Sequence, residues 1–209
     1  MNVALCYVFP DLDHQTYIPL ARRFVDTYVK NPPGDCDHSI HVLVNMGEEK
    51  DIKAYRRLFS PLECQFIMHN NYGKDIGAYQ LAARTIDCDL MICFGAPVHF
   101  HKPGWMDRIA ITYDQNGPAL YGAWGFELPG PHIRTTAFWL PPEILNSYPS
   151  LVSNGTRYEF EHGTNSIHRH VEKLGLESFM TTWTGCYARH EWRHASRDES
   201  LILDQHSEK

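Results

Sequence analysis

A strand, a glycine-rich turn, a helix and a second strand follow one another between residues 65 and 94, and this succession constrains the fold most. The apolar residues 66–68 run into the polar turn 70–77, where a helix must begin. A second apolar run, residues 89–94, ends at Gly95. Two strands that both end in small or polar residues can form one crevice at the carboxyl edge of a sheet. Open α/β sheets bind their ligands at that edge.

Strands and helices alternate through the first half of the chain, which predicts parallel strands joined by right-handed helical crossovers. Predicted strands cover residues 3–9, 39–44, 66–68 and 89–94, and predicted helices cover 15–30, 48–59 and 76–85. Further on, we expect helices over 104–113, 141–148 and 164–174 and strands over 119–126, 132–140 and 179–183. The predicted class is α/β, a Rossmann-like, mostly parallel sheet flanked by helices.

Size and composition fit one domain with a buried core, since the chain has 209 residues of which 43% are hydrophobic. We expect the domain to span residues 1–192 and a polar C-terminal tail to span 193–209. The formal net charge of −6 gives no basic excess, so we expect no nucleic-acid partner.

The six cysteines include no C-x-x-C pair, and three lie in apolar runs where a free thiol packs like a small core residue. The first strand begins without a basic flank, and no apolar run reaches 18 residues. We therefore expect reduced thiols, no transmembrane segment and a cytoplasmic protein.

The turn 70–77 carries the first candidate site. A helix that begins near Asp75 offers free backbone N–H groups and a positive dipole end, which suit a diphosphate or a ribose. Lys74 could supply a cation, and Asp75 could accept hydrogen bonds from hydroxyl groups. The alternative is that Asp75 caps the helix and that Gly73 and Gly77 are turn residues.

The segment 95–105 follows the second strand of this pair, and its short loop leads into a Pro-Gly-Trp helix start at residues 103–105. This order resembles the middle of GT-A-fold glycosyltransferases. Taken with the Asn-x-Gly-x-Asp-x-Gly stretch at residues 71–77, the nearest likeness is to rhamnan-synthesis-type glycosyltransferases. Those carry a similar stretch before the same strand.

The resemblance covers most of the chain and implies a GT-A-like fold. Residues 1–100 would form a nucleotide-binding front and residues 101–192 an acceptor-facing back. The implied enzyme passes a hexosyl or deoxyhexosyl group from a UDP-, GDP- or dTDP-linked sugar to a hydroxyl of a glycan or small acceptor, with inversion. It would act in polysaccharide biosynthesis, alongside other glycan-assembly domains. The implied donor-binding residues are Val8, Phe9, Asn45, Asn71, Gly73, Lys74, Asp75, Gly95 and Ala96.

The chain departs from the family at the metal-binding loop. GT-A enzymes normally carry an Asp-x-Asp motif there, whereas Ala96, Pro97 and Val98 offer no side-chain oxygen to a hard cation. Two alternatives follow. Lys74, Lys102 or Arg134 could neutralise a diphosphate without metal, or a softer metal could bind elsewhere. For the second alternative the candidates are His99 and His101, two residues apart, and the late His190.

Glu161 and His162 are the predicted catalytic residues. They resemble the acidic motif that precedes a helix and a glycine in inverting GT-A enzymes, where a carboxylate deprotonates the acceptor. A carboxylate beside an imidazole at a helix start suits a general base. The alternative is that Glu161 caps the helix and interacts with its dipole.

The predicted acceptor surface follows from position in the same family. His132, Arg134 and Thr135 place polar groups on an otherwise aromatic strand. At most one of four tryptophans, Trp105, Trp124, Trp139 and Trp183, is expected to stack on a sugar ring, and Trp105 is the one selected as a substrate-binding residue. Two further interpretations stay open. One is a non-catalytic nucleotide- or sugar-binding domain that has lost its acidic pair. The other is a nucleotide-sugar hydrolase or nucleotidyltransferase on a related sheet.

Overall fold

The computed structural model describes residues 1–47, 51–128, 130–149 and 156–205. The strands are β1 Val3–Pro10, β2 His38–Asn45, β3 Cys64–His69, β4 Leu90–Phe94, β5 Leu120–Gly122, β6 Gly125–Phe126, β7 His132–Ile133, β8 Ala137–Leu140, β9 Ser178–Thr181 and β10 Cys186–Ala188. The helices are α1 His14–Lys30, α2 Ile52–Leu58, α3 Lys74–Thr85, α4 Trp105–Asn116, α5 Pro142–Ser147, α6 Thr156–His162 and α7 Ile167–Lys173, with short 3₁₀ helices η2 Arg189–His194 and η3 Arg197–Glu199. None of these described helices is long and apolar enough to cross a bilayer.

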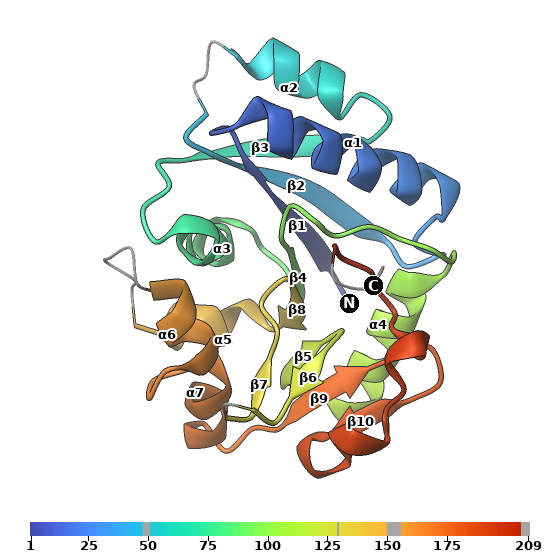
Figure 1. Ribbon diagram of the computed structural model, residues 1–209, viewed down its shortest axis with the longest axis vertical. Coiled ribbons are helices and arrows are strands. Elements are labelled where there is room, and N and C mark those ends of the chain that lie inside the picture. The colour runs from blue at the N-terminus through green and yellow to red at the C-terminus, as the bar shows by residue number, and fades with distance from the viewer. Residues whose placement is uncertain (48–50, 129, 150–155, 206–209) are drawn as a thin grey trace.

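One sheet of eight strands, in the order β10-β9-β5-β8-β4-β1-β2-β3, forms the centre of the molecule (Figure 1). β1 pairs in parallel with β2 and β4, β2 with β3, and β5 with β9. β8 and β10 run against the other six strands. The predicted mostly parallel sheet flanked by helices is confirmed. Its register places Pro10 beside Asn45 and Asn45 beside His69, so the carboxyl ends of β1, β2 and β3 meet at one edge.

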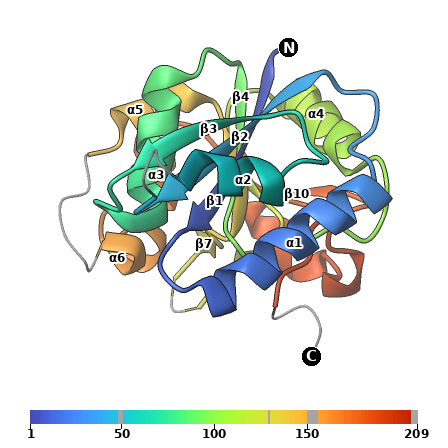
Figure 2. The same ribbon diagram turned by 90° about the horizontal axis from the view of Figure 1, so that it is seen from above.

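Helices cover both faces of the sheet because β1 is apolar on both sides. Its odd-numbered residues, such as Leu5 and Tyr7, pack with α1, α2 and α4, whereas Ala4, Cys6 and Val8 pack with α3, α5, α6 and α7. Figure 1 shows α3, α5, α6 and α7 grouped on one side, and Figure 2 shows α1 and α4 away from α3 and α5. A strand buried on both faces reads as a continuous apolar run.

The second half of the chain differs from the predicted elements. The helix predicted over 164–174 is confined to α7, whose N-cap Ser166 accepts a hydrogen bond from the Arg169 N–H. The preceding segment, for which no helix is predicted from the sequence, forms helix α6. The strand predicted over 132–140 is broken between β7 and β8, because the backbone at residues 135 and 136 bonds to other elements. The first residues of the helix predicted over 48–59 lie outside the described residues.

Residues 193–205 are not the polar tail that the sequence predicts. Leu201, Ile202 and Asp204 are fully buried. The backbone of Leu203 exchanges two hydrogen bonds with that of His99, at 2.9 and 3.1 Å. Two buried apolar residues and a backbone bridge hold this segment against the loop after β4, so the described domain continues to residue 205.

The free energy of unfolding should fall as the pH drops below about 6.5. Burial lowers the pKa of His41, which is 5% exposed, because desolvation disfavours the imidazolium. A histidine whose pKa is lower in the folded than in the unfolded chain gives full stability above its unfolded pKa of about 6.5. That contribution is lost as the pH falls through this value toward the folded pKa. Urea unfolding between about pH 7 and 5 measures the loss, and His41→Leu should make it smaller. An unchanged pH dependence in His41→Leu would contradict this assignment.

Candidate functional site

The carboxyl edge of the parallel strands is held together by polar contacts. The Nδ1 atom of His69, at the end of β3, lies 2.8 Å from Oδ1 of Asn45 and accepts the Asn71 N–H at 3.1 Å. At the end of β4, the Tyr7 hydroxyl donates to the Ala96 carbonyl at 2.9 Å. The Gly95 N–H donates to the carbonyl of Thr136 at 2.8 Å. The end of β3 is thus joined to that of β2, and the end of β4 to β1 and to the segment before β8. β1 and β2 lie between the two strand ends that the sequence predicts to form a crevice.

The turn before α3 has a backbone that few sequences can adopt. Asn71, Gly73 and Lys74 have φ angles of 66°, 75° and 56°, in the left-handed region that favours glycine and asparagine. Gly77 lies under this turn, and a Cβ atom on it would stand 1.9 Å from the Tyr72 carbonyl oxygen. The predicted glycines thus have separate tasks: Gly73 starts the helix, and Gly77 lets the turn approach the helix closely.

Gly77→Ala should displace the turn that carries Asn71 and Lys74, because a backbone carbonyl 1.9 Å away cannot move without moving the turn. We expect a loss of about 1–3 kcal/mol in unfolding free energy, in the range for overpacking. Gly130→Ala is the matched control, since a Cβ at Gly130 meets nothing within 4 Å. Equal stability of the two variants in urea unfolding would show that the turn is not packed as described.

Asp75 lies in the first turn of α3 and pairs with Arg157 of α6, with Nη1 3.3 Å from Oδ2. The Asp75 side chain is 13% exposed. Burial raises its pKa, the Glu161 charge acts in the same direction, and the Arg157 guanidinium opposes both. Asp75 is not the helix cap, because the N-cap of α3 is Gly73, which makes no side-chain cap bond; Oδ1 of Asp75 accepts the N–H of the next residue, Ile76. Through Arg157, Asp75 is joined to α6, the helix that carries Glu161.

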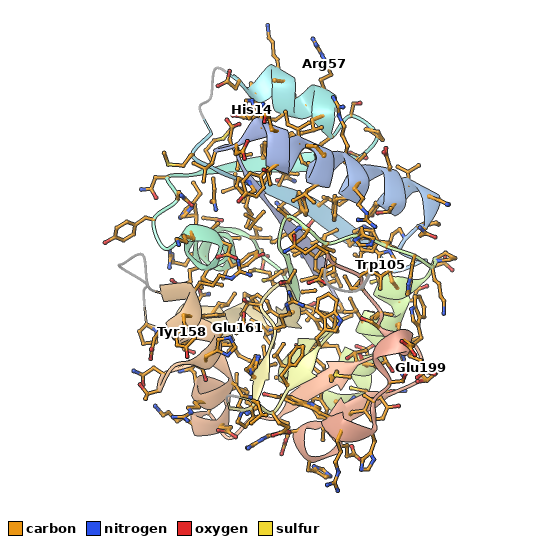
Figure 3. All side chains as sticks on the ribbon, viewed as in Figure 1. His14, Arg57, Trp105, Tyr158, Glu161 and Glu199 are labelled. Carbon is orange, nitrogen blue, oxygen red and sulfur yellow. The ribbon has the colours of Figure 1, made fainter. Side chains whose placement is uncertain are left out.

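Glu161 lies on the face of α6 that is turned toward the sheet, four residues after Arg157. Its side chain is 13% exposed, whereas Tyr158 on the same helix is 67% exposed and points away (Figure 3). Oε2 of Glu161 accepts the Thr135 N–H at 3.1 Å and the Thr135 hydroxyl. The carbonyl of the next residue, Thr136, accepts the Gly95 N–H. The bonds from Thr135 therefore hold the Glu161 carboxylate beside the end of β4. The alternative that Glu161 caps the following helix is not met, because the N-cap of α7 is Ser166 and Glu161 accepts its hydrogen bonds from Thr135.

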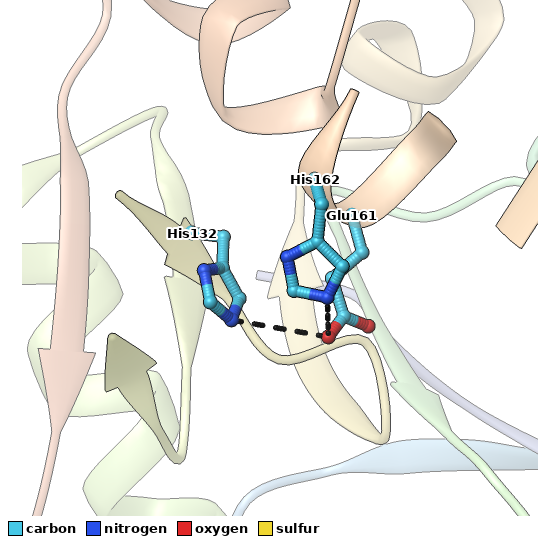
Figure 4. Close-up of side chains that lie close together, drawn as sticks. All are labelled: His132, Glu161 and His162. Atoms are coloured by element: carbon cyan, nitrogen blue, oxygen red, sulfur yellow. Dashed lines mark ion pairs between the residues drawn. The ribbon is translucent and has the colours of Figure 1, made fainter. Parts of the chain in front are cut away.

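Two imidazoles face the other oxygen of Glu161 (Figure 4). Nε2 of His162 lies 3.2 Å from Oε1, and Nε2 of His132, on β7, lies 4.0 Å from it. The two rings pack edge to face with centroids 4.2 Å apart. Burial lowers the pKa of His162 and His132 acts the same way, while Glu161 opposes them. His132, predicted as a substrate-binding residue, thus joins the two predicted catalytic residues.

The loop after β4 does not fit the divalent ion that the resemblance implies. Ala96 and Val98 are buried apolar residues, and neither they nor Pro97 offers an oxygen ligand from a side chain. The two histidines beyond them point to separate partners: Nε2 of His99 lies 2.8 Å from an Arg23 nitrogen, and Nε2 of His101 accepts the Trp183 indole N–H. His190 is exposed on η2. Among the described residues, the ligand atoms of His, Cys, Asp and Glu converge in one group of three: His132, Glu161 and His162.

Several predicted contact residues are not placed to meet a ligand with their side chains. Val8 and Phe9 are each 2% exposed and pack into opposite cores. Trp105, the predicted stacking platform, is fully buried. A strand that is apolar on both faces points its side chains into the core on either side of the sheet. Val8 and Phe9 can therefore offer a ligand at the sheet edge only their backbone groups.

Arg134 is bound by a residue that sequence reasoning missed. Its Nη1 lies 3.1 Å from Oδ2 of the buried Asp204, and its guanidinium lies 5.5 Å from the Trp124 ring centroid. No local pattern could identify Asp204, because its partner is far away in sequence. The Arg157–Glu161 spacing did carry a signal, since residues four apart share one face of a helix.

No family model and no curated protein matches the chain. Among solved structures it is similar to a mannosyltransferase from Pyrobaculum calidifontis in complex with GDP-mannose and Mn²⁺, at a TM-score of 0.62 and 12% identity. That alignment covers 91% of this chain, which spans 59% of the mannosyltransferase. A putative glucose-1-phosphate thymidylyltransferase from Bacillus anthracis aligns at a TM-score of 0.56 and 10% identity, over 89% of this chain and 88% of that one. Mouse xyloside xylosyltransferase 1 aligns at 0.51 and 10%, over 71% and 70%.

These likenesses confirm the predicted GT-A-like fold. At 10–12% identity they show the fold alone, and they include both sugar-transferring and nucleotide-transferring enzymes. The chemistry of this chain must therefore be argued from its own residues.

Proposed function

We propose that this chain is a glycosyltransferase domain that moves a hexosyl or deoxyhexosyl group from a UDP-, GDP- or dTDP-linked sugar to a hydroxyl of a glycan or small acceptor. The observation that carries the proposal is the Glu161 carboxylate, which Thr135 holds beside the end of β4 and which lies on the helix that Arg157 joins to Asp75. The resemblance of residues 71–77 to rhamnan-synthesis-type enzymes supports polysaccharide assembly, together with other glycan-assembly domains. The cysteine pattern supports a cytoplasmic enzyme.

In the proposed reaction, the nucleoside lies over the ends of β1 and β2, near Asn45 and Asp75. The diphosphate meets the Lys74 ammonium and the positive dipole end of α3, beside Gly95 and Ala96. Asn71 and Gly73 shape the turn that presents these groups. Arg134 is held by Asp204, which favours Lys74 as the neutralising cation.

The transfer step would invert the anomeric carbon. A bond forms from the acceptor oxygen to that carbon while the bond to the diphosphate oxygen breaks, and the electron pair leaves with the nucleoside diphosphate. Glu161 takes the acceptor proton, and His162 orients the receiving oxygen. His132 and Thr135 border the acceptor.

Calorimetric titration of the chain with UDP, GDP and dTDP, each with and without Mn²⁺, tests the donor site. We expect one nucleoside diphosphate to bind, with an affinity that changes less than threefold on adding Mn²⁺. The reason is that the loop after β4 supplies no oxygen ligand from its side chains. The absence of binding by all three nucleotides would contradict the proposal.

A nucleotidyltransferase or nucleotide-sugar hydrolase is the second candidate, because the thymidylyltransferase aligns over 88% of its own length. Product analysis with a nucleotide-sugar panel separates the candidates. A glycosyltransferase releases a nucleoside diphosphate. A hydrolase that cleaves at the α-phosphate releases a nucleoside monophosphate and a sugar 1-phosphate, and a nucleotidyltransferase supplied with pyrophosphate releases a nucleoside triphosphate and a sugar 1-phosphate. A non-catalytic binding domain would release none of these.

A further inference from the structure

We propose that His132, Glu161 and His162 form a binding site for one divalent ion of the borderline class, of which Zn²⁺ is the representative. This site is separate from the loop after β4, where GT-A enzymes hold their metal. It goes beyond the proposed function, because the ion is bound by these three side chains whether or not a nucleotide is present.

The distances between the three side chains suit one ion. One ligand atom from each residue lies within 4.8 Å of the other two. The two distances to Oε1 of Glu161 are 3.2 Å from His162 and 4.0 Å from His132. Zn–N and Zn–O bonds of about 2.0–2.2 Å place two ligands of one ion about 3–4 Å apart. A small rotation of one imidazole therefore completes the set.

Two of the three ligands, His132 and Glu161, are already oriented by a second partner. Nδ1 of His132 lies 2.7 Å from the Gly130 carbonyl oxygen, to which it can only donate. In the neutral imidazole, that bond leaves the lone pair on Nε2, the atom that faces Glu161. Phe126 stacks on the His132 ring, with ring centroids 5.3 Å apart. Oε2 of Glu161 is held by Thr135, so Oε1 is left for the ion. Metal-binding histidines and carboxylates usually have such partners.

The site is partly dehydrated and its ligand atoms face one another. Nε2 of His132 lies 4.0 Å from Oε1 of Glu161, and the two side chains are 6% and 13% exposed. A divalent cation between a nitrogen lone pair and a carboxylate oxygen is attracted to both, and more strongly in such a site than in water. Two imidazoles and one carboxylate bind Zn²⁺ in enzymes that keep an open coordination position.

The open position gives the ion a role in the transfer reaction. A hydroxyl bound to a divalent cation loses its proton more readily, so an acceptor hydroxyl bound to the ion would pass its proton to Glu161 more easily. This consequence rests on the proposed function, whereas binding of the ion does not.

The test is a titration of the chelator-treated full chain with Zn²⁺ against a chromophoric chelator, in the absence of nucleotide. We expect one equivalent to bind and His132→Ala to weaken binding at least tenfold. Thr135→Val, which loses one bond to Glu161, should weaken it about tenfold. His190→Ala is the matched control, since His190 is exposed and outside the cluster, and it should bind as the unaltered chain does.

X-ray absorption of the zinc-loaded, unaltered chain identifies the ligands of the ion without depending on the folding of any variant. Two imidazole nitrogens and one carboxylate in the first coordination sphere would support the site. A sphere with one imidazole or none, or an affinity that His132→Ala leaves unchanged, would overturn it. Neither of these results would change the outcome of the nucleotide titration. The proposed function is therefore tested independently of the metal site.

Discussion

Glu161→Gln should lower the rate of sugar transfer about 10²–10⁴-fold, the usual contribution of a positioned general base, while nucleotide affinity changes less than twofold. The amide keeps the shape of the carboxylate and can still accept both hydrogen bonds from Thr135. It cannot take a proton from an acceptor. The measurements are transfer rate with the nucleotide sugar selected by the panel, and calorimetric affinity for the corresponding nucleoside diphosphate.

Glu159→Gln is the matched control, because it makes the same change two residues earlier on α6. Oε1 of Glu159 accepts bonds from the Thr164 hydroxyl and the Asn165 N–H, which hold the loop before α7. We expect this variant to keep most of its transfer activity. Turnover that survives Glu161→Gln, or that Glu159→Gln lowers equally, would show that Glu161 is not the base.

The first half of the fold could be predicted because its strands and helices are encoded locally. β1 and β4 are apolar throughout since both faces are covered, and Asp13 caps α1 by accepting the Gln15 N–H at 3.1 Å. The turn before α3 was recognisable from its glycines, which the left-handed backbone requires. These features need no knowledge of distant partners.

The second half could not be predicted as well because distant contacts decide its boundaries. The gap between β7 and β8 follows from the bonds of Thr135 to Glu161 and of Thr136 to Gly95. The C-terminal segment reads as polar, yet Leu201 and Ile202 fill the core and Leu203 pairs with His99. Such short elements are fixed by burial and pairing more than by periodicity.

The candidate site was predictable as a set of residues but not as an arrangement. Glu161 and His162 were singled out by resemblance to the acidic motif of inverting GT-A enzymes, and the structure places the predicted substrate-binding residues His132 and Thr135 around the same carboxylate. Trp105 shows the opposite case. An aromatic residue at a helix start beside a predicted site suggests a sugar platform, but composition does not reveal which way the ring points.

Trp105→Ala should lower the free energy of unfolding by about 3–5 kcal/mol, the range for removing a buried aromatic side chain. The indole is fully buried and stacks on Phe100 with centroids 4.3 Å apart. It also meets Phe94 and Tyr28, at 5.8 and 6.0 Å. Its Nε1–H donates to the Asn31 carbonyl at 3.2 Å, so the substitution leaves a cavity and a buried acceptor without this donor.

Trp105→Phe separates the two contributions. It retains most of the ring contacts and removes the indole donor, so we expect a smaller loss of about 1–2 kcal/mol. Urea unfolding measures the free energy of unfolding of both variants. If Trp105→Ala is already partly unfolded without urea, Trp105→Phe can still be compared with the unaltered chain. Since the ring contacts core residues on α1, α4 and the loop after β4, the folded fraction of each variant should bind nucleotide normally. A Trp105→Ala chain of unchanged stability with weakened sugar binding would restore the interpretation of Trp105 as a sugar platform.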